Sequence, residues 1–323
     1  MRSSFAILAA ILNLANICRA ISPVLPGLWA DPNIAVFGQE YYLYTTEDGF
    51  PGWSGQQFYV WKSSDLVNWI RGTDAILTLN GTSGNVPWSD GSAWAPTIAE
   101  KNGTYYFYFS GNNPTYNRKT IGVAIADKPD GPYTAQPTAF ITNSESIRAN
   151  QAIDPYAFHD PVSGKDYLLW GNGHALCAEL SDDMLSIKEN TITALSGLTN
   201  FNEASSVAYR KGVYHFNYAI NDTRSEYYAT GYATSTNLTG PYTYQYPILQ
   251  LNATLGILGT GGSTLLNVPR TDDWYIAYHR FQIPDGNGTL RETTIDRVYF
   301  DSKTGLIEKV VPTLEGVSAE TVP

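Results

Sequence analysis

The feature of this sequence that most restricts its fold is a unit of matched internal spacing that occurs five times. Each unit begins with an acidic or small residue that starts a β-type run, and a turn and an aromatic run follow. In three units a tyrosine of the aromatic run comes eleven positions after the first residue, and in two it comes thirteen positions after: Asp31–Tyr42, Ala95–Tyr106 and Glu203–Tyr214, then Asp154–Tyr167 and Gly262–Tyr275. Repeats of this size predict a propeller or a solenoid.

The runs inside each unit have the composition of β-strands. Residues 41–46 and 105–110 are short, aromatic or β-branched, and bounded by Gly, Asn or Asp. Helical periodicity never persists beyond about a dozen residues. Each unit holds two or three such runs and room for a fourth, which is the size of a propeller blade. We therefore predict an all-β, five-bladed β-propeller that forms a single domain over residues 21–323. A two-layer β-sandwich is the alternative, but it does not account for five units of matched spacing.

The beginning of the chain resembles a secretion signal. Residues 1–20 contain an early positive charge, an apolar run over 5–14 and a small residue at the end, and the apolar run is too short for a membrane span. We therefore predict a signal peptide over residues 1–20 and a secreted, extracellular protein. We also predict a glycoprotein, because Asn-x-Ser/Thr sequons occur at Asn80, Asn102, Asn221, Asn237, Asn252 and Asn287. The formal charge of −10 argues against nucleic acid and anionic membranes as partners. We expect a monomer.

Three of the five units begin with a carboxylic acid. In a propeller the first strand of every blade lines the central axis, so Asp31, Asp154 and Glu203 should meet at one end of the channel. Like charges in one cavity repel one another and lose hydration, which raises at least one pKa and suits a proton donor. Alone, each acid would more often be a turn or surface residue; together, at matched offsets, they indicate catalysis.

The same segments resemble glycoside hydrolase family 43, the five-bladed arabinofuranosidases, xylosidases and arabinanases. The resemblance covers nearly all of the chain after residue 20 and rests on five motifs in order: Ala30-Asp31-Pro32-Asn33-Ile34, Ser92-Ala93-Trp94-Ala95-Pro96-Thr97, Ile153-Asp154-Pro155, Glu203-Ala204-Ser205 and Tyr278-His279-Arg280. The resemblance implies hydrolysis with inversion at the anomeric carbon. Asp31 would be the general base, Glu203 the general acid, and Asp154 the residue that raises the pKa of Glu203 and positions it.

Five further residues are candidates for binding the sugar. Trp94, Trp29 and Phe201 come just before ring positions and could wall the pocket; the alternative for Trp94 is a core position between two blades. Arg280 could bind a sugar hydroxyl or orient Asp31, or it could form a salt bridge within the fifth unit. His279 could line the channel, but a lone histidine is more often structural.

No cluster has the spacing of metal ligands, and no cofactor is required. Many members of the resembled family place a histidine early in blade five, beside a central calcium ion or water cluster. Here that stretch reads Gly259-Thr260-Gly261-Gly262-Ser263, with no histidine. This difference argues against a structural calcium ion in the channel, which stays an alternative.

The sequence thus predicts an exo-α-L-arabinofuranosidase that acts on arabinan or on arabinose-bearing plant cell-wall polysaccharide. A β-xylosidase or an endo-1,5-α-L-arabinanase with the same three acids is the near alternative. Tryptophans in the loops at 48–57 and 80–91, Trp53 and Trp88, favour a walled pocket and exo action. A carbohydrate-binding propeller without catalysis is a second alternative, and the intact acids argue against it.

Overall fold

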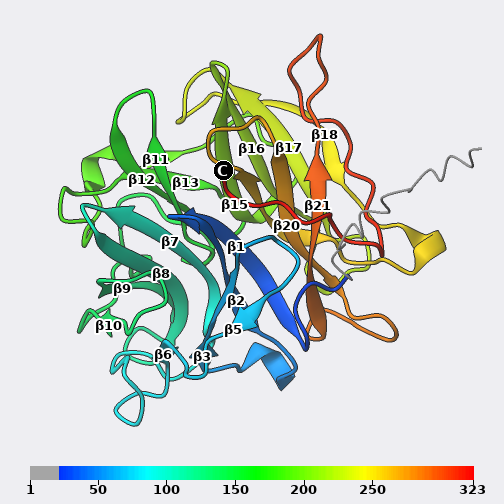
Figure 1. The fold of residues 1–323 in the computed structure, drawn as a ribbon. Coiled ribbons are helices and arrows are strands. Elements are labelled where there is room, and N and C mark those ends of the chain that lie inside the picture. The colour runs from blue at the N-terminus through cyan, green and yellow to red at the C-terminus, as the bar shows by residue number, and fades with distance from the viewer. Residues whose placement is uncertain (1–21) are drawn as a thin grey trace, which may run out of the picture.

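The structure is a computed structural model that describes residues 22–323, so the predicted signal peptide at 1–20 lies outside the described residues. Five antiparallel sheets are arranged in a ring, which confirms the predicted five-bladed β-propeller (Figure 1). Each sheet follows the chain from its first strand outward, because short turns connect neighbouring strands. No helix among residues 22–323 is long and apolar enough to cross a membrane.

Four blades have four strands each. Blade one contains β1 (Trp29–Phe37), β2 (Glu40–Glu47), β4 (Val60–Ser63) and β5 (Ile70–Arg71). Blade two contains β7 (Trp94–Lys101), β8 (Thr104–Asn113), β9 (Arg118–Ala126) and β10 (Thr134–Ala135). Blade three contains β11 (Tyr156–Asp160), β12 (Lys165–Trp170), β13 (Leu176–Glu179) and β14 (Thr193–Ala194). Blade four contains β15 (Phe201–Arg210), β16 (Val213–Ile220), β17 (Ala229–Ser235) and β18 (Thr243–Leu249).

The fifth blade closes the ring with three strands, β19 (Gly261–Asn267), β20 (Trp274–Phe281) and β21 (Arg291–Val298). The start of the described chain packs beside β21: the Val24 N–H donates to the Thr293 carbonyl at 2.9 Å. The first and last segments of the propeller are thereby joined. The remaining elements are a small ribbon of β3 (Gln57–Phe58) with β6 (Leu77–Thr78), and three 3₁₀ turns at Pro51–Trp53, Glu189–Thr191 and Ala253–Leu255.

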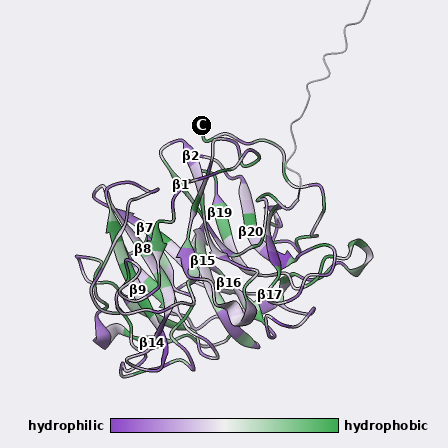
Figure 2. Ribbon diagram, turned by 90° about the horizontal axis from the view of Figure 1, so that it is seen from below, coloured by the Kyte–Doolittle hydropathy of each residue, from purple (hydrophilic) through white to green (hydrophobic). Residues whose placement is uncertain are grey.

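The hydrophobic core lies between the blades. Five buried clusters each combine side chains of two neighbouring blades, as Tyr44 of blade one and Phe107 of blade two do at a ring distance of 5.8 Å. Figure 2 shows the hydrophobic residues on strands such as β8 and β9, and hydrophilic residues along the loops. Most of the aromatic runs therefore serve to hold the blades together, which leaves the first strands free to present polar groups to the axis.

Candidate active site

One residue with positive φ lies in the first strand of each blade or, in blade three, two residues before it. The residues are Asp31 (49°), Ala95 (41°), Asp154 (55°), Ala204 (56°) and Gly262 (53°). In four of the five blades the strand pairing slips at this point, which marks a β-bulge. A bulge bends the strand and changes the direction of its side chains. The repeated conformation shows that the five units are equivalent in structure as well as in spacing.

This conformation corrects the predicted alignment of blade four. The bulge residue there is Ala204, so Glu203 lies one position before the place that Asp31 and Asp154 occupy. The register of the paired strands makes Glu203 equivalent to Trp94, because both residues immediately precede the slip. The prediction counted eleven positions from Glu203 to Tyr214. Because aromatic residues are adjacent in this run, the count did not reveal that the equivalent position of the first strand lies one residue later.

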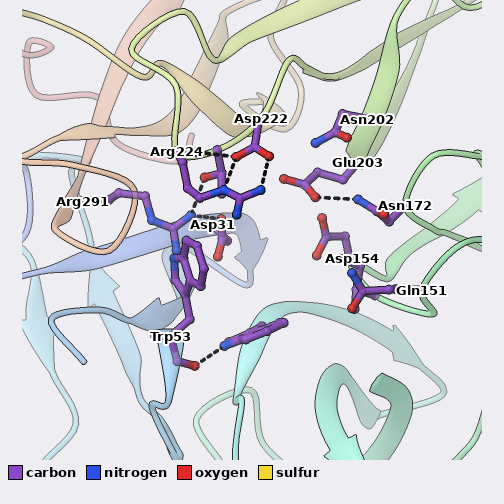
Figure 3. Close-up of a pocket in the computed structure, with 13 residues that line it drawn as sticks. Asp31, Trp53, Gln151, Asp154, Asn172, Asn202, Glu203, Asp222, Arg224 and Arg291 are labelled. Atoms are coloured by element: carbon purple, nitrogen blue, oxygen red, sulfur yellow. Dashed lines mark hydrogen bonds and ion pairs between the residues drawn. The ribbon is translucent and has the colours of Figure 1, made fainter. Parts of the chain in front are cut away.

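Despite this shift, the three acids line one cavity of about 370 Å³. Figure 3 shows Asp154 and Glu203 on one side of it with Asn172 and Gln151, and Asp31 on the other side with Arg291. Trp53 also faces the cavity, and so does Trp94, whose indole N–H donates to the Trp53 carbonyl at 2.7 Å. The cavity is therefore bounded by aromatic rings and contains carboxylates on opposite sides.

Asp31 is held as a carboxylate. Its Oδ1 accepts a hydrogen bond from Arg291 Nη1 at 3.2 Å, and its Oδ2 accepts one from the Thr46 hydroxyl at 2.7 Å. Burial acts to raise the pKa of Asp31, but the charge of Arg291, together with the Thr46 hydrogen bond, outweighs it and holds the pKa well below its usual range. The side chain remains 19% exposed, so it can reach a bound water.

His279 supports Asp31 from behind. Burial and the nearby charge of Arg291 lower the pKa of His279, so the ring is neutral and its Nδ1 accepts the Asp31 backbone N–H at 3.1 Å. The next two blades have an equivalent contact. The Thr46 hydroxyl accepts the backbone N–H of Ala95 at 2.8 Å, and the Ser110 hydroxyl accepts that of Asp154 at 3.0 Å. These bonds fix each bulge residue to the preceding blade.

Gly262 is required by the same contact. Its φ is +53°, and a Cβ there would lie 2.5 Å from His279 Cε1 and 2.9 Å from Asp31 Oδ1. Any side chain would displace the imidazole that positions Asp31. The glycine-rich start of blade five therefore makes room for His279.

Asp154 and Glu203 form the opposite side of the cavity. Asp154 Oδ2 accepts the backbone N–H of Ala204 at 3.0 Å, which places it beside Glu203. Glu203 accepts hydrogen bonds from the Tyr228 hydroxyl at 3.0 Å and from Asn172 Nδ2 at 3.0 Å. Burial raises the pKa of both acids; the Glu203 charge raises the pKa of Asp154 further, and the Asp31 charge adds to both. Two acids so close cannot both ionise readily, so this side of the cavity retains a proton.

The arrangement is therefore asymmetric. One wall carries an ionised carboxylate beside an arginine, and the other carries a pair of acids that hold a proton. Acid–base catalysis at one pH needs a general acid that is protonated and a general base that is ionised. A raised pKa on one wall and a lowered pKa on the other meet this need.

The structure separates the five predicted sugar contacts. Trp94 lines the cavity. Trp29 is a correction, because it is 4% exposed and packs edge-on against Tyr59 and Trp61 in the core.

Arg280 is also corrected: it is 1% exposed and binds Glu292, which matches the alternative of a salt bridge inside the fifth unit. Phe201 packs on Tyr218 and is not among the residues that line the cavity. His279 is fully buried and acts through Asp31, and Trp88 stacks on Phe109 instead of walling the cavity.

Several cavity residues were not found from the sequence. Gln151 and Asn202 stand within three positions of a ring acid, so closeness to Asp154 and Glu203 is a signal that could have identified them. Arg291 and the segment Asp222–Arg224 carry no such signal, because they come from loops or strand ends that only the closed ring brings to the cavity.

The sequence left open a calcium ion in the central channel. No group of three or more His, Cys, Asp or Glu within residues 22–323 is arranged to hold a metal ion. The channel beneath Asp31 and Asp154 has a volume of about 30 Å³, with Ser205, Ser263 and Thr264 among its lining residues.

Comparison with known proteins agrees with this geometry. Residues 20–304 match the family described as "Glycosyl hydrolases family 43". The chain is 33% identical to the β-D-galactofuranosidase xynD of Aspergillus niger, over 94% of this chain and 88% of that protein. It is 27% identical to a xylosidase/arabinosidase of Bacteroides ovatus, over 91% and 97% of the two chains. Among solved structures, a thermostable family-43 glycoside hydrolase superimposes with a TM-score of 0.80 at 24% identity, over 93% of this chain and 98% of that one.

Proposed function

The chain belongs to glycosyl hydrolase family 43, and from this premise we propose that it is an inverting, exo-acting α-L-arabinofuranosidase that removes terminal arabinofuranose from plant cell-wall polysaccharide. The observation that carries the proposal is the placement of the three acids on opposed walls of one cavity, with Asp31 beside Arg291 and Asp154 beside Glu203.

The reaction follows from the protonation states of these three acids. Glu203 gives its proton to the glycosidic oxygen as the bond from that oxygen to the anomeric carbon breaks. A water attacks the anomeric carbon from the opposite face, and its proton passes to Asp31. Asp154 keeps a proton available to Glu203 by preventing ionisation of both acids. Arg291 and His279 hold the Asp31 carboxylate in place.

The shape of the cavity supports exo action. Trp53 and Trp94 wall it, and the Trp53 indole N–H donates to the Gly288 carbonyl at 2.6 Å, which fixes the ring. On another part of the rim, Arg224 pairs with Asp222. A walled cavity accepts one terminal sugar more readily than the interior of a long chain, which argues against the endo-arabinanase alternative.

A different terminal sugar is a second candidate. The Aspergillus niger relative is named a β-D-galactofuranosidase, and others are named xylosidases. A β-D-galactofuranosyl ring has the same ring configuration as an α-L-arabinofuranosyl ring and differs by one exocyclic carbon with its hydroxyl. The choice between them therefore depends on the rim, and a β-xylosidase stays open as well.

The deciding experiment compares nitrophenyl α-L-arabinofuranoside, β-D-galactofuranoside and β-D-xylopyranoside as substrates for the wild type and Glu203→Gln. We expect the arabinofuranoside to be hydrolysed fastest, and the variant to be slower by roughly 10²–10⁴-fold. Equal turnover in the variant would remove Glu203 from the reaction. Folded wild type that cleaves none of the three would favour a non-catalytic carbohydrate-binding propeller.

Asp31→Asn distinguishes the base from the acid. We expect its loss of rate to persist with an activated leaving group, because such a group replaces the need for an acid but not for a base. Rescue by an activated substrate would mark Asp31 as the acid instead. Proton NMR of the first anomer released tests inversion.

We also propose that the protein is secreted, glycosylated and monomeric. Asn80, Asn102, Asn221, Asn237 and Asn287 are exposed, which leaves them open to modification, whereas Asn252 is half-buried. Intact mass before and after glycosidase treatment of protein recovered from a culture medium tests secretion and glycans together.

A further inference from the structure

A second cavity adjoins the catalytic one. It has a volume of about 420 Å³, within the range of about 300–1,000 Å³ typical of ligand pockets. Gln151 lines both cavities. The backbone of Gln151 bridges to Asn172, whose side chain donates to Glu203. The second cavity therefore lies beside the part of the catalytic cavity that Gln151 lines, and Figure 3 shows Gln151 on the same side as Asn172 and Glu203.

Under the proposed function, this is the side on which the rest of the substrate must lie. Glu203 protonates the oxygen that links the terminal sugar to its neighbour, so the departing part of the substrate has to pass close to Glu203. Asp31, which activates the water, is on the opposite side. A cavity reached past Gln151 is thus placed to bind the sugar after the cleaved bond or a branch on it.

The second cavity contains two cations without carboxylate partners. Lys119 Nζ contacts only neutral groups, the Ser92 hydroxyl at 2.8 Å and Asn112 Oδ1 at 3.2 Å, and lies 4.4 Å from the Trp94 ring centre. Arg118 donates to the carbonyls of Tyr116 and Asn143 at 3.3 and 3.2 Å. Neither forms an ion pair with an acid of residues 22–323.

Lys119 is half-buried, and its ammonium lies beside the Trp94 ring that also lines the catalytic cavity. Burial lowers the pKa of Lys119, while the charge of Asp90 acts to raise it, so a bound anion would stabilise its charged form. A lysine ammonium has three N–H donors and an arginine has five, so both residues keep donors free for a ligand. The amides of Asn117 and Asn150 line the same cavity and can bind hydroxyl groups.

We propose that this second cavity is a subsite for a uronic acid residue of the polysaccharide, whose carboxylate binds Lys119 and Arg118. The inference rests on the proposed function, since it assigns the departing part of the substrate to the Glu203 side. It narrows the natural substrate to an acidic polysaccharide, either a xylan with glucuronate branches or a pectin with galacturonate.

The test uses binding, so that it does not depend on turnover. Calorimetry with Glu203→Gln measures glucuronosyl-xylotriose against its carboxyl-reduced, neutral counterpart, and trigalacturonate against trigalactose. At least one acidic ligand should bind about tenfold more tightly than its neutral match, because a charge-assisted hydrogen bond gains about that much. Whichever acid binds identifies the polysaccharide.

Arg118→Gln and Lys119→Gln, each added to Glu203→Gln, should remove most of this preference and leave the neutral ligand unaffected within about twofold. Lys303→Gln, an exposed cation in a distant turn, is the matched control and should keep the preference. Equal binding of acidic and neutral ligands, or a preference that survives both substitutions, would overturn the subsite. Absence of wild-type activity on every nitrophenyl glycoside would instead overturn the proposed function, and the two failures are thus separable.

Discussion

Two buried arginines on neighbouring strands of the fifth blade have opposite roles. Arg280 on β20 donates to Glu292 at 2.9 Å and to the Thr313 carbonyl at 3.3 Å. Arg291 on β21 donates to both oxygens of Asp48, at 2.7 and 2.9 Å, and to Asp31 at 3.2 Å. The carboxylate partner of Arg280 is its cross-strand neighbour in the same sheet, whereas the two carboxylates that bind Arg291, Asp31 and Asp48, belong to blade one and the loop after its second strand. One arginine joins strands within a blade, and the other joins the end of the ring to the catalytic base at its beginning.

Burial alone does not determine whether a buried arginine affects the active-site acids. Both guanidinium groups are almost inaccessible to water, at 1% and 5% exposure. Burial therefore does not separate them. Contact with the cavity does, because Arg291 lowers the pKa of Asp31, Asp154 and Glu203, while Arg280 contacts none of the three acids.

Replacing Arg291 should give the largest difference between the two arginines. Arg291→Met removes the charge that opposes the burial of Asp31 and leaves the Thr46 hydrogen bond, so the pKa of Asp31 rises and the base is protonated at higher pH. We expect kcat to fall roughly 10²–10³-fold, the range for loss of one fixed electrostatic contact. The acidic limb of the pH–rate profile should move to higher pH. A fall in kcat with an unchanged acidic limb would mean that Arg291 binds substrate instead of controlling Asp31.

Asp154→Asn tests whether Asp154 keeps Glu203 protonated on the wall of the cavity opposite Arg291. With one carboxyl group gone, Glu203 no longer competes with a like charge for ionisation, so its pKa should fall. Activity requires a protonated Glu203, so the basic limb of the profile should move to lower pH. A shift of one pH unit lowers the rate about tenfold above that limb. An unmoved basic limb, with normal folding by circular dichroism, would show that Asp154 does not control the proton on Glu203.

Asp48→Asn should weaken the site less, because an amide can still accept a hydrogen bond from Arg291. With the Asp48 charge removed, Arg291 interacts more strongly with Asp31, which lowers the basicity of Asp31. We expect kcat to fall roughly tenfold, less than the hundredfold that a misplacement of 1 Å can cost. The acidic limb should move to lower pH, opposite to Arg291→Met. Shifts in the same direction would contradict the assignment of Asp48 as the anchor of Arg291.

The two arginines also mark what the sequence can reveal. The repeated unit predicted the blade number, and the acids at the starts of the units predicted the cavity, since both are local patterns. The one-residue position of Glu203 was missed, because a bulge is a backbone feature that residue counting does not detect. Arg291 was missed and Arg280 chosen because Arg280 belongs to a recognisable motif, whereas the contact of Arg291 with Asp31 spans 260 positions and exists only after the ring closes.

Arg280→Met should give the smallest catalytic effect and the clearest effect on stability. Removing the arginine leaves the buried Glu292 carboxylate without its ion-pair partner, which destabilises a protein by about 3–5 kcal/mol. Burial already raises the pKa of Glu292 against the opposing charge of Arg280, so loss of Arg280 raises it further. Glu292 then takes up a proton as pH falls, and the deficit in melting temperature should shrink towards acidic pH.

Arg280→Met combined with Glu292→Leu should recover most of the stability, since no unpaired charge remains. In both variants kcat/KM should stay within about twofold of the wild type, because Arg280 has no contact with the three acids. A tenfold loss of kcat/KM in the stabilised double variant would show that the two arginines act on the site together, and the distinction between them would fail.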